Sequence, residues 1–344
     1  MLTSLQYMRG VTAMMVVYFH IVLQIEGLNG GSSLLPRIGT SAVDVFFVLS
    51  GFVIWSTTLS RDSNAWHFYR RRIVRVVPLY WGATATAAVA AILLPHLMES
   101  TRFDPAHFLA SMLFVPWPNP SYPASSGNHL APLVVPGWTL NYEMLFYLLF
   151  GLLLPFRPIL RGLLLALLFL VVLALPSLLA APLPGLAFYS FGYLIEFLLG
   201  AGIAALALRT PPLTPLTSAV VLAAGVVMLL GLDFMHVERA PIPWMAFAAT
   251  LIVYAAVALE HRGAVPASPL FSLLGEASYS IYLTNVFVLA ALRIMWRALE
   301  LPVDPAGEIL FLLVGLGVSA AVGTVVHLLY EKPAARMTRR LLGA

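Results

Sequence analysis

Residues 162–181 have the sequence GLLLALLFLVVLALPSLLAA and contain no charged side chain. About 20 helical residues are needed to cross a hydrocarbon core about 30 Å thick, so this stretch is long enough to be a transmembrane helix. Nine other apolar stretches, bounded by Pro, Gly and charged residues, bring the predicted spans to ten. The ten spans are 9–26, 39–59, 76–97, 138–155, 162–181, 188–208, 214–232, 243–260, 277–299 and 307–330. The chain is therefore predicted to be an all-α membrane protein with about ten transmembrane helices in one bundle.

The composition supports the same fold class. Of the 344 residues, 60% are hydrophobic and only 10% are Asp, Glu, Lys or Arg, whereas soluble domains carry about 25% charged residues. This charge is too little to cover a water-facing surface of such a size, which excludes a soluble enzyme. The chain has no cysteine, which excludes disulfides, thiolate nucleophiles and Cys-ligated metals. No motif resembles a zinc-binding helix, so no metal is expected.

Lysine and arginine on alternate loops predict the orientation of the chain. With a cytoplasmic N-terminus, only 5 of the 19 Lys and Arg residues fall on the outer side, as the positive-inside rule requires. The five are Arg37, Arg102, Arg239, Arg293 and Arg297. Both termini are therefore expected in the cytoplasm. Because the positive charge is first a topology signal, nucleic acid is not an expected partner.

No internal repeat or long hydrophilic segment divides the chain, so residues 1–344 are expected to form a single membrane domain. The longest loop is 98–137, which is predicted to be extracytoplasmic. Six prolines follow a short apolar stretch in this loop, and proline at such a density cannot sustain a long helix. We expect an ordered loop that caps the acceptor site, with room for one re-entrant or interfacial helix. Residues 331–344 are expected to be a short cytoplasmic tail.

Three protonatable side chains are predicted to lie at one depth in the membrane. A charged group inside a span costs at least about 2.5 kcal/mol, so those that occur are candidates for a functional site. Arg9 and His20 are 11 residues apart on the first span, and eleven steps of about 100° bring them to the same stripe of a helix. Asp44 and Glu143 fall about five residues inside the outer ends of their spans, at the predicted depth of His20.

His20 is the candidate base of this layer because an imidazole takes and returns a proton near neutral pH. A carboxylate beside it, from Asp44 or Glu143, would fix its tautomer and stabilise the imidazolium. The structural alternatives stay open. His20 would then be hydrogen-bonded between helices, and Asp44 or Glu143 would pair with an arginine or cap its helix.

A basic cluster, YRRRIVRVVP, occupies residues 69–78 at the start of the third predicted span. Arg72 and Arg75 are at i and i+3, so they project together from a helix and can bind a phosphate bidentately. Arginine suits this use better than lysine. The alternative is a topogenic basic loop that faces anionic lipid. Glu331 is expected near this cluster as an ion-pair partner.

Polar residues also gather inside apolar segments. They are Ser50, Gly51, Trp138, Thr139, Asn141, Ser278, Tyr279, Ser280, Tyr282, Thr284 and Asn285. Small residues in spans usually mean close helix packing, and aromatic residues near span ends usually mean interface anchors. Their clustering favours a hydrated cavity in the bundle.

Six motifs in chain order carry a family resemblance. They are LQYMRGVTAMMVVYFH (5–20), SAVDVFFVLSG (41–51), RRIVRVVPLYW (71–81), GWTLNYEMLFY (137–147), LGEASYSIYL (274–283) and YEKP (330–333). Together they resemble the membrane-bound acyltransferase family 3, whose members are O-acyltransferases that modify surface polysaccharides, lipopolysaccharide and other extracytoplasmic acceptors. The resemblance covers nearly the whole chain. It implies a multi-pass enzyme of the bacterial inner (cytoplasmic) membrane.

The resemblance also implies roles for single residues. His20 matches the essential histidine of the family and Arg9 its partner, while Arg72 and Arg75 match the R-x-x-R pair assigned to the acyl-coenzyme A donor. Arg9, Arg72 and Arg75 are the predicted donor-binding residues. Further matches are Phe46, Phe47, Ser50 and Gly51 in the F-F-x-x-S-G motif, Trp138 and Glu143 around the W-[ST]-L motif, and Tyr279 and Tyr282 in the S-Y-x-x-Y-L motif. Asn285 stands where many members have a histidine, so a second catalytic histidine is not expected. The chain is expected to lack the hydrolase-like domain that some members carry, so the membrane domain is expected to complete the transfer.

The implied reaction moves an acyl group, acetyl in the first instance, from cytoplasmic acyl-CoA to a hydroxyl of an extracytoplasmic glycan or lipid-linked saccharide. His20 would act as the general base, or as an acyl carrier. Two alternatives are a flippase for a lipid-linked glycan, which would show inverted repeats that are not found, and an acyltransferase for a small molecule. Membrane lipid is a further expected partner, and a homo-oligomer is left open.

Overall fold

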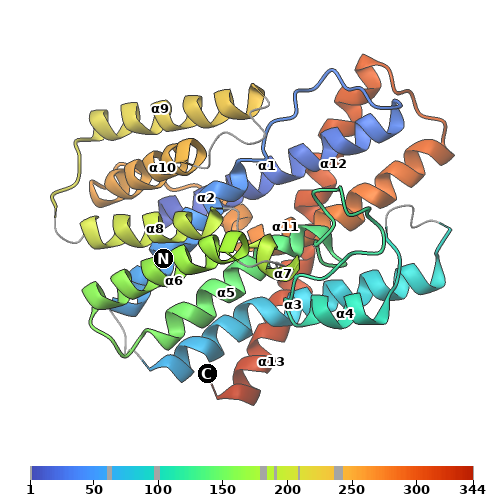
Figure 1. Cartoon of the computed structure of the whole chain (residues 1–344). Coiled ribbons are helices and arrows are strands. Elements are labelled where there is room, and N and C mark those ends of the chain that lie inside the picture. Colours follow the sequence, from blue (N-terminus) through green and yellow to red (C-terminus); the bar gives the residue numbers. More distant parts are fainter. Residues whose placement is uncertain are drawn as a thin grey trace. The chain divides into compact units, whose positions relative to one another are not determined.

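The computed structural model describes residues 2–59, 64–96, 101–178, 184–189, 192–207, 210–235 and 243–343. Arg239, residues 98–100 and the ends of several predicted spans lie outside the described residues. All regular elements in the described part of the chain are helices (Figure 1). This confirms the all-α fold class.

Eight helices in the described ranges are long and apolar enough to cross a membrane. They are α1 (Thr3–Leu28), α2 (Ala42–Leu59), α3 (Ala65–Leu93), α6 (Pro158–Leu178), α9 (Pro215–Phe234), α10 (Pro243–His261), α11 (Pro269–Ala298) and the stretch Pro305–Leu342, which comprises α12 (Pro305–Val326), the π-helical turn η2 (His327–Glu331) and α13 (Lys332–Leu342). A multi-pass membrane protein is therefore confirmed. The count of ten spans and the cytoplasmic termini stay predictions.

The two remaining predicted spans form shorter helices. α5 (Trp138–Leu152) and α8 (Tyr193–Ala207) have 15 residues each. At 1.5 Å per residue such a helix is about 22 Å long, which is less than the hydrocarbon thickness of about 30 Å. The short helix α7 (Pro184–Phe188) precedes α8. The described part of the long loop contains α4 (Pro105–Met112) and the 3-10 turn η1 (Val135–Gly137).

Two helices begin earlier than their apolar stretches. α3 begins at Ala65 and not at residue 76, because the Asn64 side chain caps it by accepting from Trp66 N at 2.8 Å. α11 begins at Pro269 and not at residue 277, since Ser268 caps it and proline is well suited to the first helical position. The basic cluster at 69–78 therefore lies inside a helix. Hydropathy marks the apolar part of a helix and not its first residue.

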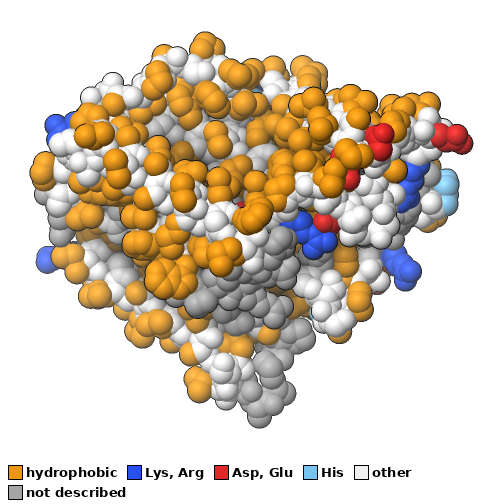
Figure 2. Space-filling model, turned by 90° about the horizontal axis from the view of Figure 1, so that it is seen from above, with side chains coloured by type: hydrophobic (Ala, Val, Ile, Leu, Met, Phe, Trp, Pro, Cys, Tyr) orange, Lys and Arg blue, Asp and Glu red, His pale blue; other side chains and the backbone are white. Residues whose placement is uncertain are grey.

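The surface of the molecule carries many apolar side chains. On α6, for example, Leu163, Leu167 and Leu170 are each more than half exposed. Hydrophobic side chains are also spread over the face seen in Figure 2, where charged groups are fewer. Exposed apolar area of this extent is unfavourable in water and is expected of helices that face lipid.

The chain divides into two compact units. The first unit comprises Met1–Ser56 and Leu199–Leu329, and the second comprises Thr57–Leu198 and Tyr330–Ala344. In the first unit, α1 packs against α11 and α12, and α9 packs against α10. In the second unit, α3 packs against α4, α5 and α13, and α5 packs against α6.

Two glycines bring α1 and α11 together in the first unit. A Cβ atom added to Gly10 would lie 2.9 Å from Gly275 N, and one added to Gly275 would overlap the backbone oxygen of Gln6. One turn earlier, the rings of Tyr7 and Phe271 lie 5.6 Å apart between centroids. The order of these pairs means that the two helices run parallel. Because lipid gives no hydrophobic drive for helix association, close packing through small residues is what holds such a pair together.

The second unit contains an ordered part of the long loop, built around His107. Its Nε2 lies 3.0 Å from Ala131 O, and Asn119 Nδ2 donates to the same oxygen at 3.1 Å. A carbonyl only accepts, so Nε2 carries the proton. The other ring nitrogen, Nδ1, is buried and has no hydrogen-bond partner within the described residues. Burial lowers the pKa of the His107 imidazole, although the bond to Ala131 and the nearby Asp104 oppose this effect.

The contact between α1 and α11 can be tested at Gly275. An alanine there forces the backbones apart, and overpacking of this kind costs about 1–3 kcal/mol. Gly275→Ala should therefore lower the unfolding temperature of the detergent-purified protein. Gly317→Ala on α12 is the matched control, because nothing lies within 4 Å of its added Cβ and alanine favours a helix. Equal unfolding temperatures for the two variants would contradict the close approach.

His107 predicts how the loop responds to pH. Its pKa is about 6.5 in an unfolded chain and lower in the folded loop. The neutral ring therefore stabilises the loop above about pH 6.5, and this stability is lost as the pH falls through the folded pKa. Amides near Ala131 should exchange hydrogen faster at about pH 5.5 than at about pH 7.5, after correction for intrinsic rates. His107→Gln keeps a donor but does not titrate, so an equal response in that variant would contradict the assignment.

Candidate active site

The predicted site residues fall into the two units. The first unit holds Arg9, His20, Asp44, Phe46, Phe47, Ser50, Gly51, Tyr279, Tyr282 and Asn285. The second unit holds Arg72, Arg75, Trp138, Glu143 and Glu331. His20 and Glu143 thus belong to different units, and the predicted convergence of His20, Asp44 and Glu143 at one depth stays a prediction.

His20 of α1 is bound by Asn285 of α11. The distance between His20 Nδ1 and Asn285 Oδ1 is 2.6 Å. Asn285 is fully buried, and its Nδ2 donates to two carbonyls of its own helix, Ile281 O at 3.2 Å and Tyr282 O at 2.6 Å. Because both partners of Nδ2 can only accept, the amide cannot be turned around, and Oδ1 must face the histidine.

This geometry fixes the tautomer of His20. Asn285 Oδ1 is an acceptor, so Nδ1 of the imidazole carries the proton. In the neutral ring Nε2 then keeps its lone pair, which is the form that a general base needs. The sequence suggested a carboxylate, Asp44 or Glu143, for this orienting role, but the side chain that the structure places on Nδ1 is an amide.

The packing of α1 on α11 sets the level at which these two side chains meet. His20 and Asn285 follow Gly10 and Gly275 by the same number of residues, so two parallel helices that touch at the glycines bring them together. α2 adds a further contact, because the ring of Phe46 lies edge-on to Tyr282 with 6.0 Å between centroids. The carbonyl of Tyr282 is one of the two that hold Asn285.

Two of the other polar residues of α11 donate hydrogen bonds to carbonyls of their own helix. Ser278 Oγ donates to Gly275 O at 2.8 Å, and Thr284 Oγ1 donates to Ser280 O at 2.7 Å. Tyr279 is half-buried, as is Arg9 on α1. On α2, Phe47 and Gly51 are buried and Ser50 is half-buried. The bonds of Ser278 and Thr284 agree with the helix-packing alternative, and the hydrated cavity stays a prediction.

Asp44 occupies the first turn of α2 and is buried. A carboxylate at this position interacts favourably with the helix dipole and the free N–H groups of the turn. The placement agrees with the helix-capping alternative for Asp44. A part in proton transfer stays a prediction.

In the second unit, Arg72 of α3 lies near two aromatic rings that are perpendicular to one another. Its guanidinium carbon is 5.5 Å from the centroid of the Phe68 ring and 5.6 Å from that of Tyr147. The hydroxyl of Tyr147 donates to Glu143, one turn away on α5. A guanidinium that is attracted to aromatic rings still has N–H groups that can bind an anion. Glu143 is thus hydrogen-bonded to the hydroxyl of one of the two rings beside Arg72.

Arg75 follows on α3 and is exposed. It is close enough to Tyr147 to interact with it electrostatically, as Arg72 is. Nε of Arg72 is buried and has no hydrogen-bond partner in the described part of the chain. The pair offers two positive charges and unsatisfied N–H groups, which is the chemistry that a phosphate ligand needs.

The end of the chain packs beside these arginines. Tyr330 Oη donates to Pro78 O at 3.2 Å, and a Cβ on Gly82 would overlap the Tyr330 ring. Glu331 follows directly, so the structure brings the YEKP motif onto α3 just beyond Arg75. On α5, Trp138 packs against Tyr193, with 5.2 Å between centroids.

Three buried carboxylates were not predicted. Asp233 and Glu308 are 4% and 5% exposed, and Glu196 is fully buried. All three fall within or beside predicted spans, so the rule that charge is costly in a membrane could have identified them. Within the described ranges, no group of three or more His, Cys, Asp or Glu side chains could hold a metal ion.

Comparison with known proteins identifies the family. The sequence model of the acyltransferase family 3, described as an acyltransferase domain, matches residues 2–328. The chain is similar to the exopolysaccharide production protein ExoZ of Rhizobium meliloti (strain 1021), with 33% identity over 314 residues that cover 88% of this chain and 91% of that protein. It is also similar to the acyltransferase MdmB of Streptomyces mycarofaciens, with 32% identity over 160 residues, 44% of this chain and 38% of that protein. No solved structure matches. The chain belongs to the acyltransferase family 3.

The tautomer of His20 can be measured directly. In protein labelled with ¹⁵N-histidine, the neutral His20 ring should show a protonated Nδ1 and an unprotonated Nε2, with the signal assigned by its loss in His20→Gln. Asn285→Leu removes the acceptor and should yield a mixture of both tautomers. Thr284→Val is the control, because that hydroxyl bonds only within α11 in the described contacts. A protonated Nε2 in the wild-type protein would contradict the geometry.

Proposed function

We propose that this member of the acyltransferase family transfers an acyl group, acetyl in the first instance, from cytoplasmic acyl-CoA to a hydroxyl of an extracytoplasmic glycan or glycolipid. The acceptor oxygen forms an ester bond with the acyl carbon, and the thioester bond to coenzyme A breaks. Nε2 of His20 takes the proton of the hydroxyl and returns it to the leaving thiolate. The products are the acylated acceptor and free coenzyme A.

The observation that carries this proposal is the Asn285–His20 hydrogen bond. A histidine whose Nδ1 is held by a buried acceptor has a defined direction for its Nε2 lone pair. This is the arrangement by which an orienting residue prepares a histidine base in hydrolases. The structural alternative, a histidine that only joins two helices, would not require the amide to be fixed by two further bonds.

Arg72 and Arg75 are the proposed donor-binding residues. Coenzyme A carries several phosphates, and arginines at i and i+3 bind such groups bidentately. The rings of Phe68 and Tyr147 lie within cation–π distance of the Arg72 guanidinium and attract it. The positive-inside rule, applied to the Lys and Arg residues of the whole chain, predicts that this pair lies on the cytoplasmic side, where acyl-CoA is found.

The acceptor proposal rests on the relatives. ExoZ is named for exopolysaccharide production, and it matches nearly the whole chain. A hydroxyl of an exported polysaccharide, or of its lipid-linked precursor, is therefore the proposed acceptor. The proposed location is the inner membrane of a bacterium, with both termini in the cytoplasm. MdmB, which matches less than half of the chain, is named only as an acyltransferase and does not identify an acceptor.

Two sets of variants separate the chemistry from donor binding. His20→Ala should abolish acyl transfer, measured as O-acyl groups on surface glycan by mass spectrometry, while purified protein still binds coenzyme A. Arg72→Gln and Arg75→Gln should each weaken coenzyme A binding at least about tenfold, because a hydrogen bond to a charged group contributes about 1.5–3 kcal/mol.

Arg157→Gln is the matched control for the arginine variants. Arg157 is exposed on the connection between α5 and α6 and loses the same charge. It should leave coenzyme A binding unchanged. Wild-type transfer by His20→Ala would refute the role of His20. Unchanged binding by both arginine variants would favour a flippase without covalent chemistry.

A further inference from the structure

Residues 29–41 join α1 to α2 in the first unit and form a segment that we call the strap. Two buried carboxylates hold it, Glu308 near its beginning and Asp233 at its end. Neither takes part in the chemistry proposed above. A buried carboxylate is costly unless its oxygens are hydrogen-bonded, so the strap and these two residues depend on one another.

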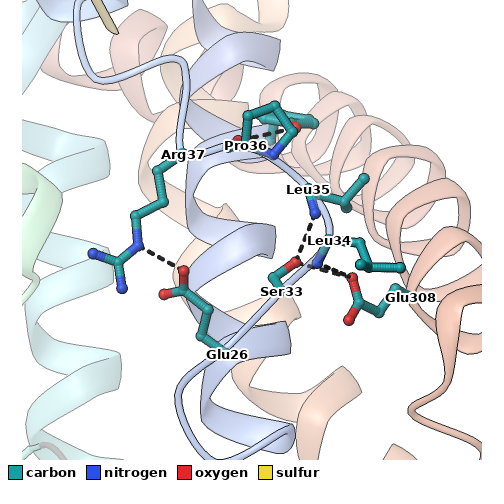
Figure 3. A network of polar contacts seen from close by, with 8 residues as sticks. Glu26, Ser33, Leu34, Leu35, Pro36, Arg37 and Glu308 are labelled. Carbon is teal, nitrogen blue, oxygen red and sulfur yellow. Dashed lines mark hydrogen bonds and ion pairs between the residues drawn. The ribbon is translucent and has the colours of Figure 1, made fainter. Parts of the chain in front are cut away.

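Glu308 fixes the first half of the strap (Figure 3). It lies in the first turn of α12 and accepts from Asn29 Nδ2 at 2.7 Å, Ser33 Oγ at 3.0 Å and Leu34 N at 2.9 Å. An ion pair between Arg37 Nε and Glu26 Oε1 at 2.6 Å ties the next part of the strap to the end of α1.

Asp233 fixes the second half. It lies near the end of α9 and accepts four hydrogen bonds, from Gly39 N at 2.7 Å, Thr40 Oγ1 at 2.6 Å, Ser41 N at 3.3 Å and Ser41 Oγ at 2.7 Å. These donors directly precede Ala42, the first residue of α2. Asp233 therefore works as a cap supplied from another helix, and it determines where α2 begins.

The end of the strap lies against α1 beside the turn that carries His20. A Cβ on Gly39 would be 2.5 Å from Met15 O and 3.5 Å from Phe19 Cβ. Its φ of +102° is also a conformation that favours glycine. Tyr18 Oη donates to Pro36 O at 3.1 Å. The strap thus folds back along α1, from its end to the residues just before the histidine.

We propose that Asp233 is a positioning residue for acyl transfer, which acts by holding the strap against the His20 turn of α1. It has two routes to the histidine. One is the direct contact of Gly39 with the turn before His20. The other runs through α2, because Phe46 packs on Tyr282, whose carbonyl holds the Asn285 amide. This inference rests on the proposed role of His20 as the base.

Asp233→Asn tests the proposal with a change of one atom. Four donors converge on two carboxylate oxygens, and asparagine offers only one acceptor oxygen. The maximal rate of acyl transfer should fall about 10- to 100-fold, since a displacement of about 1 Å costs about this much. Coenzyme A binding should be unchanged, because it is assigned to arginines of the second unit. Asp304→Asn is the control, since Asp304 caps α12 locally through Gly307 N at 2.8 Å and asparagine caps equally well.

A second variant separates position from chemistry. Thr40→Cys with Asp233→Cys places two thiols in a chain that has no other cysteine. Bridging them, by oxidation or with a short bifunctional thiol reagent, restores the contact without the carboxylate. The bridged protein should transfer acyl groups at least about tenfold faster than the reduced one.

Three results would overturn the proposal. They are a wild-type rate in Asp233→Asn, a parallel loss of coenzyme A binding in that variant, and equal rates in the bridged and reduced forms of the double-cysteine variant. His20→Ala, measured in the same assay, distinguishes a failure of the Asp233 proposal from a failure of the proposed function. If His20→Ala still transfers acyl groups, the role of the base fails, whatever the strap variants show.

Discussion

The close approach of α1 and α11 at Gly10 and Gly275 is the constraint on which the first unit depends. In a membrane, two helices gain little from burying apolar surface against each other, so backbone contact through small residues has to hold them. Once two parallel helices touch at one level, residues that are equally far from this contact along the two helices lie side by side, because both helices rise by the same distance per residue. His20 and Asn285 meet because they are equally far from that contact.

Three buried polar side chains of the first unit, Asn285, Asp233 and Glu308, are each held by several hydrogen bonds. Asn285 uses its amide for two carbonyls and its oxygen for the histidine, and Asp233 and Glu308 accept four and three bonds. Such groups define one arrangement of helices, because any other would leave a buried polar atom unsatisfied.

The parts that sequence could predict are those set by local periodicity. Apolar length identified the membrane helices, and the spacing of Arg72 and Arg75 placed them on one side of α3. The partner of His20 could not be found in this way, because helical register between α1 and α11 depends on a contact between residues far apart in the chain. The partners of Asp233 could not be found for a similar reason. Nothing in the local sequence connects it with Gly39, Thr40 and Ser41.

The neutral partner of His20 bears on the proposed mechanism. A histidine and an amide carry no net charge at rest, so burying them among apolar helices costs less than burying a histidine with a carboxylate. The same choice removes the negative charge that would stabilise an imidazolium once it forms. A base held in this way favours a transfer in which the proton passes promptly to the departing thiolate. The amide therefore orients the His20 ring but does not stabilise a positive charge on it. The rate of transfer then depends more strongly on how accurately the surrounding helices place the histidine.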